Sequence, residues 1–259
     1  MTRISAKAKL KESGFLLGSF VEIGAPGLVE IFGLTGFDFV VIDCEHAAFS
    51  GETVAAMVRG AEASGVAPFV RVRENAAGQI LEALDLGAAG LHIPQIGSAD
   101  DAIRAVRAAK FPPAGGRGFN PFVRAAGYGT ETLETFRRTA DNDTLLVLHI
   151  EAQETLEQVE EILAVPGIDV AFLGPYDLSQ TMGIPGQVTH PKVRDAMRAV
   201  VKAAAKHNVA VGCFANSPEH TAIWLGEGVS YLTYSVDSFI FVEACRAIRR
   251  QVDRLRSGS

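Results

Sequence analysis

Charged and imidazole side chains lie in or directly after four short apolar runs of the chain, and their types suit one kind of chemistry. They are Asp43 and His46 after the run 39–42, Arg71 within the run 67–72, Glu151 after the run 144–150, and Asp177 after the run 169–173. Together they provide a base with an acidic neighbour, a cation and two further carboxylates. Such a set can remove a proton beside a carbonyl group and stabilise the negative charge that develops on the oxygen.

The elements that must position these residues follow from the hydrophobic pattern. Short apolar runs alternate with longer segments of helical period, which is typical of a parallel sheet with connecting helices. The eight runs are 15–20, 39–42, 67–72, 90–93, 144–150, 169–173, 209–213 and 230–235, and the clearest helical segments are 52–64, 76–86, 99–109, 154–164, 191–207 and 237–255. Eight β/α units match the size of a closed barrel. We therefore predict an α/β fold, a single (β/α)8 TIM barrel domain over residues 1–259.

One stretch, 111–142, does not follow this alternation. It begins with several prolines and glycines, among them Pro112, Pro113 and Gly115. We predict a long loop after the fourth strand. Long ordered loops often act as lids or subunit contacts, and a solvated excursion is the equally weighted alternative.

In such a barrel the carboxyl ends of the strands form one face, where catalytic residues lie. Taken singly, each polar residue has a structural explanation: Asp43 can cap a helix, and Arg71 can pair with Glu45 or Asp85. However, four strands deliver such side chains to the same face, and buried charges are costly unless they are paired or bound to a metal. The combination therefore favours a shared site.

The residue types indicate a metal and a keto acid. Glu151 and Asp177 offer oxygen ligands that suit Mg²⁺, Mn²⁺ or Co²⁺, and two carboxylates leave most of the coordination shell free. A 2-oxo acid can chelate such an ion, which then stabilises the enolate formed when a proton leaves. Arg71 is a second stabiliser of the oxyanion. His46 is the predicted general base, and Asp43 is expected to orient its ring.

Other chemical routes are disfavoured. A Schiff-base lysine would project from a strand, whereas all seven lysines lie near the start of the chain or on predicted helices and their ends. The turns after the last two strands lack the glycine-rich amides that usually bind phosphate. We therefore expect a divalent metal, no organic cofactor and an unphosphorylated substrate.

Composition limits the partners and the compartment. A formal net charge of -6 argues against binding to nucleic acid or to an anionic membrane surface. The first ten residues lack the apolar stretch of a secretory signal, and no segment is apolar over the length of a membrane span. Cys44, Cys213 and Cys245 are odd in number and far apart, which fits neither a disulfide framework nor a zinc cluster. We expect a cytoplasmic protein.

A set of short motifs, highly specific in combination, carries a family resemblance over nearly the whole chain. The motifs are Asp43-Cys44-Glu45-His46, Val70-Arg71-Val72, Ala83-Leu84-Asp85-Leu86-Gly87-Ala88, Ile93-Pro94, Pro112-Pro113 with Gly116-Arg117-Gly118, Ile150-Glu151, and Gly167-Ile168-Asp169 with Gly174-Pro175-Tyr176-Asp177-Leu178-Ser179. With them the chain resembles the HpcH/HpaI aldolase/citrate lyase family. Within it, the metal-dependent class II hydroxy-oxo-acid aldolases are the most similar group.

The resemblance implies roles for particular residues. Glu151 and Asp177 would be metal ligands, His46 and Asp43 a base dyad, and Arg71 the contact to the pyruvyl oxygens. The catalytic set would comprise His46, Asp43, Arg71 and Asp85, and the substrate-binding set Arg71, Gly174, Pro175, Tyr176, Asp177 and His149. The backbone amides around Tyr176 and Asp177 would hold the substrate carboxylate.

The resemblance also implies an assembly. Aldolases of this group are homo-oligomers, so we expect a trimer or hexamer in which the last helix, 237–255, is exchanged between subunits. The alternative is a helix that closes its own barrel.

Two positions depart from the family pattern. The fifth run ends in His149-Ile150-Glu151 where the family has Gln-x-Glu, and the period of two places His149 on the same face as Glu151. His149 either contacts substrate or a metal-bound water, or is a histidine satisfied within the core. Tyr176 replaces a small residue and is expected to narrow the pocket and alter the range of aldehydes.

The expected activity is the reversible cleavage of 4-hydroxy-2-oxo acids to pyruvate or hydroxypyruvate and an aldehyde through a metal-bound enolate. An oxaloacetate decarboxylase is the first alternative, because the same enolate forms when carbon dioxide leaves. An acyl-CoA lyase is less favoured, because the net charge of -6 gives no support for a nucleotide-binding surface. A barrel that only binds 2-oxo acids would show no proton exchange.

Overall fold

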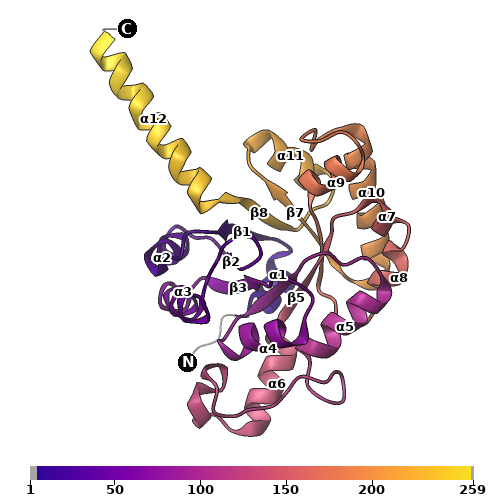
Figure 1. Cartoon of the computed structure of the whole chain (residues 1–259). Coiled ribbons are helices and arrows are strands. Elements are labelled where there is room, and N and C mark those ends of the chain that lie inside the picture. Colours follow the sequence, from indigo (N-terminus) through magenta and orange to yellow (C-terminus); the bar gives the residue numbers. More distant parts are fainter. Residues whose placement is uncertain (1–4, 258–259) are drawn as a thin grey trace.

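Eight parallel strands close into a barrel in sequence order (Figure 1). The computed structural model describes residues 5–257, so residues 1–4 and 258–259 of the predicted domain lie outside the described part. The strands are β1 (Leu16–Val21), β2 (Phe39–Asp43), β3 (Ala67–Arg71), β4 (Gly90–Ile93), β5 (Leu145–Ile150), β6 (Val170–Leu173), β7 (Ala210–Ala215) and β8 (Tyr231–Val236). The predicted TIM barrel is confirmed, and the eight apolar runs are its strands.

The helices that follow the strands surround the barrel, except for the last one, which projects from it, and one further helix precedes the first strand (Figure 1). They are α1 (Ala6–Ser13), α2 (Pro26–Leu34), α3 (Gly51–Ser64), α4 (Ala77–Asp85), α5 (Ala99–Ala109), α6 (Leu133–Asp143), α7 (Gln153–Leu156), α8 (Val159–Leu163), α9 (Pro175–Thr181), α10 (Pro191–His207), α11 (Pro218–Gly226) and α12 (Asp237–Ser257). The segment 154–164, predicted as one helix, is two, α7 and α8. The break occurs because Gln158 leaves the helical conformation, with φ -107° and ψ 6°.

Aromatic rings fill the interior of the barrel. The Phe39 ring stacks on Tyr231 and on Phe69, with centroid distances of 4.3 and 5.2 Å. Gly18 makes this packing possible, because a Cβ at that position would lie 2.1 Å from Cε2 of Phe39. Stacked rings of this size bury much apolar surface and leave little freedom of movement. The polar residues at the carboxyl ends of the strands therefore rest on a dry and rigid core.

Helix α1 lies across the amino ends of the strands. Lys7 Nζ lies 2.6 Å from Oδ1 of Asp169, which directly precedes β6. Lys9 pairs with Asp38, which directly precedes β2. Because α1 covers this end of the barrel, we expect a small molecule to enter from the carboxyl face, as is usual for this fold.

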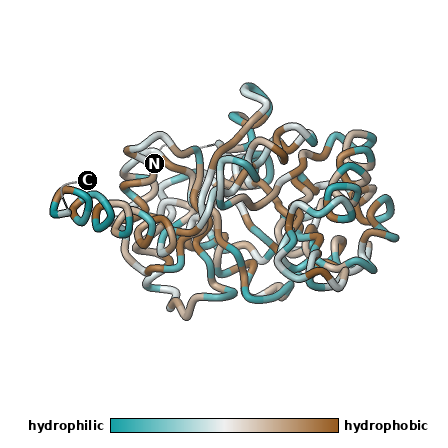
Figure 2. The backbone as a smooth tube through the Cα atoms, turned by 90° about the horizontal axis from the view of Figure 1, so that it is seen from above, coloured by the Kyte–Doolittle hydropathy of each residue, from teal (hydrophilic) through white to brown (hydrophobic). Residues whose placement is uncertain are grey.

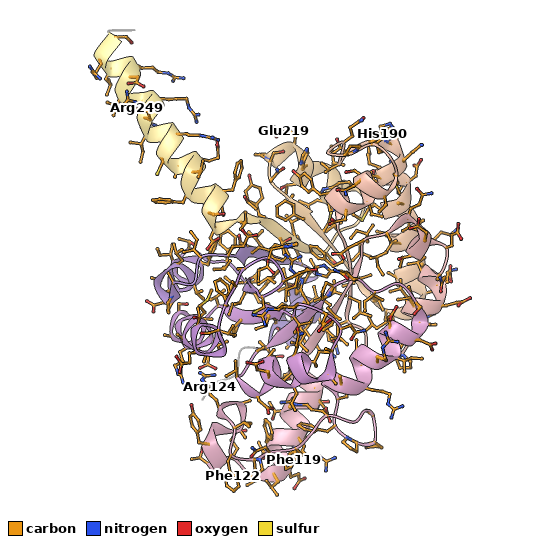
Figure 3. The ribbon with its side chains drawn as sticks, in the orientation of Figure 1. Phe119, Phe122, Arg124, His190, Glu219 and Arg249 are labelled. Atoms are coloured by element: carbon orange, nitrogen blue, oxygen red, sulfur yellow. The ribbon has the colours of Figure 1, made fainter. Side chains whose placement is uncertain are left out.

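The segment 111–142 is not a loop throughout, so this prediction is wrong for its second half. Residues 133–142 belong to α6, and a 3₁₀ helix, η1 (Arg124–Gly129), precedes it. The prolines and glycines at the start of the segment concealed a helix that begins at Leu133 and is capped by Thr132, whose hydroxyl accepts a hydrogen bond from Thr135 N at 3.3 Å. Phe111, Phe119 and Phe136 pack together in a small core of this segment, in which Figure 3 labels Phe119.

Helix α12 projects away from the barrel, as both Figure 1 and Figure 2 show. Its first residue, Asp237, is buried. The Asp237 carboxylate accepts hydrogen bonds from the backbone N–H groups of Glu22 and Ile23, both at 3.0 Å. Because the rest of this helix projects from the barrel, the alternative in which it closes its own barrel is wrong.

Within residues 5–257 we find no helix with the length and apolar character required to cross a membrane.

Candidate active site

Four strands bring polar side chains together at the carboxyl face of the barrel. Asp43 ends β2 and Arg71 ends β3, and the two residues are direct neighbours in the register of the sheet. Glu151 follows β5 directly, and Asp177 lies in the first turn of α9, shortly after β6. The geometry at this face thus places the four predicted strand-end residues in one region.

Two adjoining cavities, of about 170 and 370 Å³, lie between these strand ends, and Arg71, Glu151 and Asp177 line both. The smaller cavity also has His149, Gly174, Pro175 and Tyr176 in its wall, and the larger one has His46. All the residues predicted to bind substrate therefore face the smaller cavity.

Arg71 is buried and held in one orientation. Its Nε donates to Oδ1 of Asp43 at 2.9 Å and its Nη2 to Oδ2 at 2.6 Å, while Nη1 lies 3.0 Å from Oε2 of Glu45. The guanidinium also lies over the ring of Phe20, 4.7 Å from the centroid. Burial alone would lower the pKa of Arg71, but the hydrogen bond and the charge of Asp43 raise it. The site therefore contains a permanent, rigidly aimed cation.

The predicted dyad of Asp43 and His46 does not form within this chain. Both carboxylate oxygens of Asp43 bind Arg71, and Oδ1 also accepts from the backbone N–H groups of Glu45 and His46. No hydrogen bond joins the Asp43 carboxylate to the His46 ring in the part of the chain that the structure describes. The guanidinium on the neighbouring strand takes the fully buried carboxylate, while the exposed His46 lies in the wall of the larger cavity.

The carboxylates of Glu151 and Asp177 approach each other beside Gly174. A Cβ at Gly174 would lie 3.0 Å from Oδ2 of Asp177 and 3.2 Å from Cγ of Glu151, so a larger residue would crowd the pair. Burial and, after it, the negative charge of Glu151 raise the pKa of Asp177. Burial alone would also raise the pKa of Glu151, but hydrogen bonds from His149 and from the Gln95 backbone help to lower it.

Two polar residues behind Glu151 were missed by sequence reasoning, His92 in β4 and Tyr231 in β8. His149 Nδ1 lies 2.8 Å from Oε1 of Glu151, and its Nε2 lies 2.8 Å from Nδ1 of His92. His92 Nε2 in turn lies 2.8 Å from the Tyr231 hydroxyl. Both ring nitrogens of His149 thus have protein partners, which favours the core alternative over contact with substrate. The available signal was His92, a polar residue at an inward position of the apolar strand β4.

Tyr176 is fixed beside the smaller cavity by residues of β7 and the turn that follows it. Its hydroxyl accepts a hydrogen bond from Nδ2 of Asn216 at 2.7 Å, and the Asn216 carbonyl oxygen lies 2.9 Å from Nδ1 of His220. The ring meets Phe214 edge-on, with 5.9 Å between centroids. A side chain held in this way supports the expectation that Tyr176 narrows the pocket.

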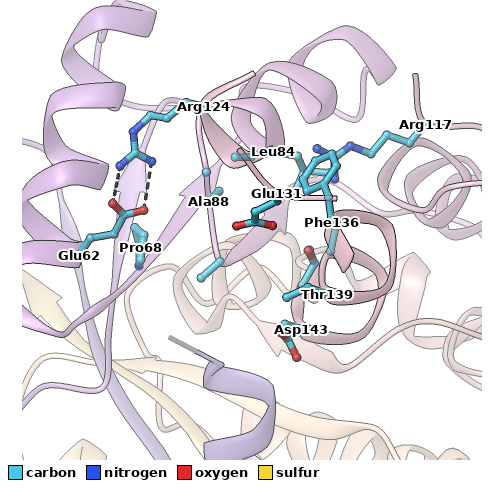
Figure 4. A pocket seen from close by; sticks show the side chains of 15 residues that line it. Glu62, Pro68, Leu84, Ala88, Arg117, Arg124, Glu131, Phe136, Thr139 and Asp143 are labelled. Atoms are coloured by element: carbon cyan, nitrogen blue, oxygen red, sulfur yellow. Dashed lines mark hydrogen bonds and ion pairs between the residues drawn. The ribbon is translucent and has the colours of Figure 1, made fainter. Parts of the chain in front are cut away.

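Asp85 does not join the cluster, so its predicted catalytic role has no support within this chain. It is the last residue of α4, which runs back toward the amino end of the barrel, and its Oδ1 accepts from Nη2 of Arg117 at 2.9 Å. Figure 4 shows a separate cavity there, lined by Arg117 and by the ion pair of Arg124 with Glu62. In a β/α barrel the helices run antiparallel to the strands, so the carboxyl end of a helix lies on the face opposite to the carboxyl ends of the strands.

A family model described as HpcH/HpaI aldolase/citrate lyase matches residues 16–244. The chain belongs to this family.

Family members with named activities align over nearly the full chain. A hydroxypyruvate/pyruvate aldolase of Paraburkholderia phytofirmans is 34% identical, covering 95% of this chain and 96% of that protein. A 2-dehydro-3,6-dideoxy-6-sulfogluconate aldolase of Pseudomonas putida is 31% identical, covering 88% and 89%. The crystal structure of a family protein from Burkholderia cenocepacia shares the fold with a TM-score of 0.87 and 33% identity, over 92% of this chain and 95% of that one. The predicted enzyme class, a lyase of the aldolase type, is confirmed.

The site fits a divalent cation bound through oxygen. Within residues 5–257, no group of three or more His, Cys, Asp or Glu side chains is arranged to hold a metal. Glu151 and Asp177 would therefore hold a cation as a pair, and water and substrate would complete its shell. Mg²⁺ and similar ions are commonly bound by one or two carboxylates in this way. A cation would also offset the effects of burial and of the Glu151 charge, which together raise the pKa of Asp177.

Proposed function

We propose that this aldolase reversibly cleaves 4-hydroxy-2-oxo acids to pyruvate or hydroxypyruvate and a small aldehyde, with Mg²⁺, Mn²⁺ or Co²⁺ as cofactor. The observation that carries the proposal is the convergence of Arg71, Glu151 and Asp177 on two shared cavities. A pair of oxygen ligands beside a fixed cation suits a substrate that presents adjacent keto and carboxylate oxygens. The name of the relative from Paraburkholderia phytofirmans supports the choice of the two keto acids.

The chain's own residues account for the proton and charge movements of the cleavage. A base takes the proton of the C4 hydroxyl, the C3–C4 bond breaks, and the aldehyde leaves while the electron pair moves to the keto acid fragment. His46, in the wall of the larger cavity, is the proposed base. The N–H bonds of Arg71 that remain after its pairs with Asp43 and Glu45 can donate to the developing oxyanion. Protonation of the fragment at C3 completes the reaction.

A cation held by Glu151 and Asp177 would supply Lewis acidity at the keto oxygen. The hydrogen bonds to Glu151 from His149 and Gln95 keep its carboxylate ionised and oriented. Gly174 leaves room for both carboxylates, and Tyr176 is expected to limit the size of the aldehyde.

Removal of divalent cations is expected to stop the reaction, and Mg²⁺, Mn²⁺ or Co²⁺ is expected to restore it. The measurement is deuterium exchange into the methyl group of pyruvate in D₂O, followed by NMR before and after treatment with EDTA. Exchange needs only proton removal beside the keto group, so the test does not depend on knowing the aldehyde.

Borohydride provides the complementary control. A protein treated with borohydride in the presence of pyruvate should keep its exchange activity once excess reagent is removed. Covalent trapping of pyruvate on a lysine would contradict the proposal, and so would exchange that EDTA leaves unchanged.

We also propose that the protein is a homo-oligomer, a trimer or hexamer, in which α12 packs on a neighbouring subunit. This helix exposes an apolar stripe whose members, Phe241, Ile248, Val252 and Leu255, recur at helical spacing. Exposed apolar surface of this extent is typical of an interface.

Deletion of residues 238–259 is expected to convert the oligomer to a monomer, because it removes the stripe but keeps the Asp237 carboxylate, which binds the backbone N–H groups of Glu22 and Ile23 after β1. The measurement is molar mass by light scattering after size-exclusion chromatography. Phe241→Asp in the full chain should act in the same direction, whereas Arg249→Ala, at an exposed position of the same helix (Figure 3), should not. A full-length protein that is already monomeric would refute the exchange.

A further inference from the structure

A buried row of hydrogen bonds connects the interior of the barrel to Glu151. It runs from the Tyr231 hydroxyl in β8 to His92 in β4, then to His149 in β5, and ends on Oε1 of Glu151, with each of its three links 2.8 Å long. Tyr231 and His92 are 0% exposed and His149 is 1% exposed. Residues from three strands are thus joined in one row that water does not reach.

The donors and acceptors of this row match in only one direction. An ionised carboxylate only accepts, whereas a neutral histidine offers one donor and one acceptor and a tyrosine hydroxyl offers one donor. His149 must therefore donate from Nδ1 to Glu151 and accept at Nε2 from Nδ1 of His92, and His92 must accept at Nε2 from Tyr231. Three donors then satisfy three links. An additional proton on either ring would leave a buried hydroxyl without an acceptor, which is costly.

Aromatic rings fix the positions of both imidazoles. Phe172 stacks on His149 with 4.7 Å between centroids and an interplanar angle of 26°. Phe20 and Phe69 lie beside His92, with centroid distances of 5.9 and 6.1 Å. Close packing of this kind holds the rings in one rotamer, so the directions of the hydrogen bonds are fixed as well.

The carboxylate at the end of the row is held on both oxygens. Oε1 accepts from His149, and Oε2 accepts from the backbone N–H of Gln95 at 3.1 Å. Gln95 adopts a left-handed backbone conformation, with φ 56°, in the turn after β4. The Gln95 backbone N–H and the His149 imidazole thus set the orientation of the Glu151 carboxylate, which faces the cavities that it shares with Asp177.

We propose that His92 and Tyr231 are positioning residues, which fix the tautomer of His149 and thereby hold the Glu151 carboxylate in the orientation that binds the metal. The inference rests on the proposed function, because Glu151 has this role only if a cation binds there. Hydrogen-bond partners behind a metal ligand typically change metal affinity by about 10- to 100-fold. Tyr231 and His92 lie further from the ion than His149, so smaller effects are expected from them.

The test compares three variants, Tyr231→Phe, His92→Phe and the double variant. Each keeps an aromatic ring in the core: Tyr231→Phe removes only the hydroxyl, and His92→Phe replaces the imidazole with an apolar ring. We expect each single variant to weaken Mn²⁺ binding, measured by electron paramagnetic resonance titration, by about 2- to 10-fold, the usual effect of one hydrogen bond. We expect the double variant to bind Mn²⁺ with the same affinity as His92→Phe, because the Tyr231 hydroxyl acts only through the His92 imidazole.

A second measurement needs neither metal nor turnover. The ¹⁵N chemical shifts of the His149 ring in the metal-free protein should show a protonated Nδ1 and a bare Nε2. In Tyr231→Phe we expect a mixture of tautomers of His92 and His149. A matched control is Tyr234→Phe, which removes a hydroxyl from the same strand at a position of opposite parity, outside the row; its spectra and Mn²⁺ affinity should equal those of the unaltered protein.

The outcomes separate the inference from the function on which it rests. Failure of the unaltered protein to bind Mn²⁺ would overturn the proposed function and the positioning role together. Normal Mn²⁺ binding in both single variants would overturn the positioning role alone. A loss in the double variant that equals the sum of the two single losses in free energy would also overturn it, since it would indicate independent packing effects. A His149 ring protonated at Nε2 in the unaltered protein would contradict the assigned direction of the row.

Discussion

Glu151→Ala is expected to abolish Mn²⁺ binding at the carboxyl face and to slow deuterium exchange into pyruvate by at least about 10³-fold. Lewis acid stabilisation of a developing negative charge is worth several kcal/mol, and about 1.4 kcal/mol corresponds to a tenfold change in rate. Asp177 would remain, but a single carboxylate at an exposed position holds a divalent cation poorly. Mn²⁺ titration and NMR exchange on the same preparation check both parts of the expectation.

Glu154→Ala is the matched control for this change. Glu154 is an exposed carboxylate on α7, three residues further along the chain, and it lines neither cavity. It should bind Mn²⁺ and exchange deuterium as the unaltered protein does. Exchange that survives in Glu151→Ala would mean that the ligand assignment is incorrect, even if the family and the fold are right.

The strands were predictable because each is a buried apolar run between polar turns. The run 90–93 has the bounds of β4, and the run 39–42 lacks only the final Asp43 of β2. Helices were less predictable where local composition and tertiary packing disagree. Helix α6 follows a stretch rich in proline and glycine, and it is stabilised by Phe136 packing on Phe111, a contact between residues 25 positions apart that sequence periodicity does not reveal.

The site was predictable to the extent that single strands encode it. Arg71, Glu151 and Asp177 could be placed at the carboxyl face because a strand end fixes the position of a side chain without knowledge of its neighbours. The partner of Asp43 could not be predicted in this way. Whether Asp43 binds His46 or Arg71 depends on the register of β2 with β3, which places Asp43 directly beside Arg71. Asp85 is a different case: the predicted helical segment 76–86 already placed it near the end of a helix, and only the family motif gave it a catalytic role.

The row behind Glu151 depends on contacts that are still more distant in sequence. His92 lies 57 positions from His149 and 139 from Tyr231, and each histidine is an isolated polar residue in an otherwise apolar strand. A buried histidine is satisfied in many ways, so the sequence gives no reason to pair these three. Closure of the barrel supplies the reason, because it turns residues of β4, β5 and β8 toward the same axis.

Arg71→Lys is expected to lower kcat by about 10²- to 10³-fold while the protein remains folded. Lysine keeps a positive charge beside Asp43, but it lacks the planar fork that binds both Asp43 oxygens and still presents N–H bonds to the cavity. Loss of one well-aimed donor to an oxyanion typically costs this much in rate. Deuterium exchange measures the rate, and urea unfolding measures the free energy of unfolding. Arg73→Lys, at an exposed position two residues further along and outside both cavities, is the matched control.

Asp43→Ala separates the catalytic from the structural part of the same ion pair. It leaves the Arg71 guanidinium buried without its main partner, and breaking a buried pair in this way typically costs about 3 to 5 kcal/mol of stability. We therefore expect Asp43→Ala to lower the free energy of unfolding far more than Arg71→Lys does. If Arg71→Lys instead lost stability by a similar amount and kept its exchange rate per folded molecule, Arg71 would be a structural residue, and the oxyanion would need another donor in the cavities.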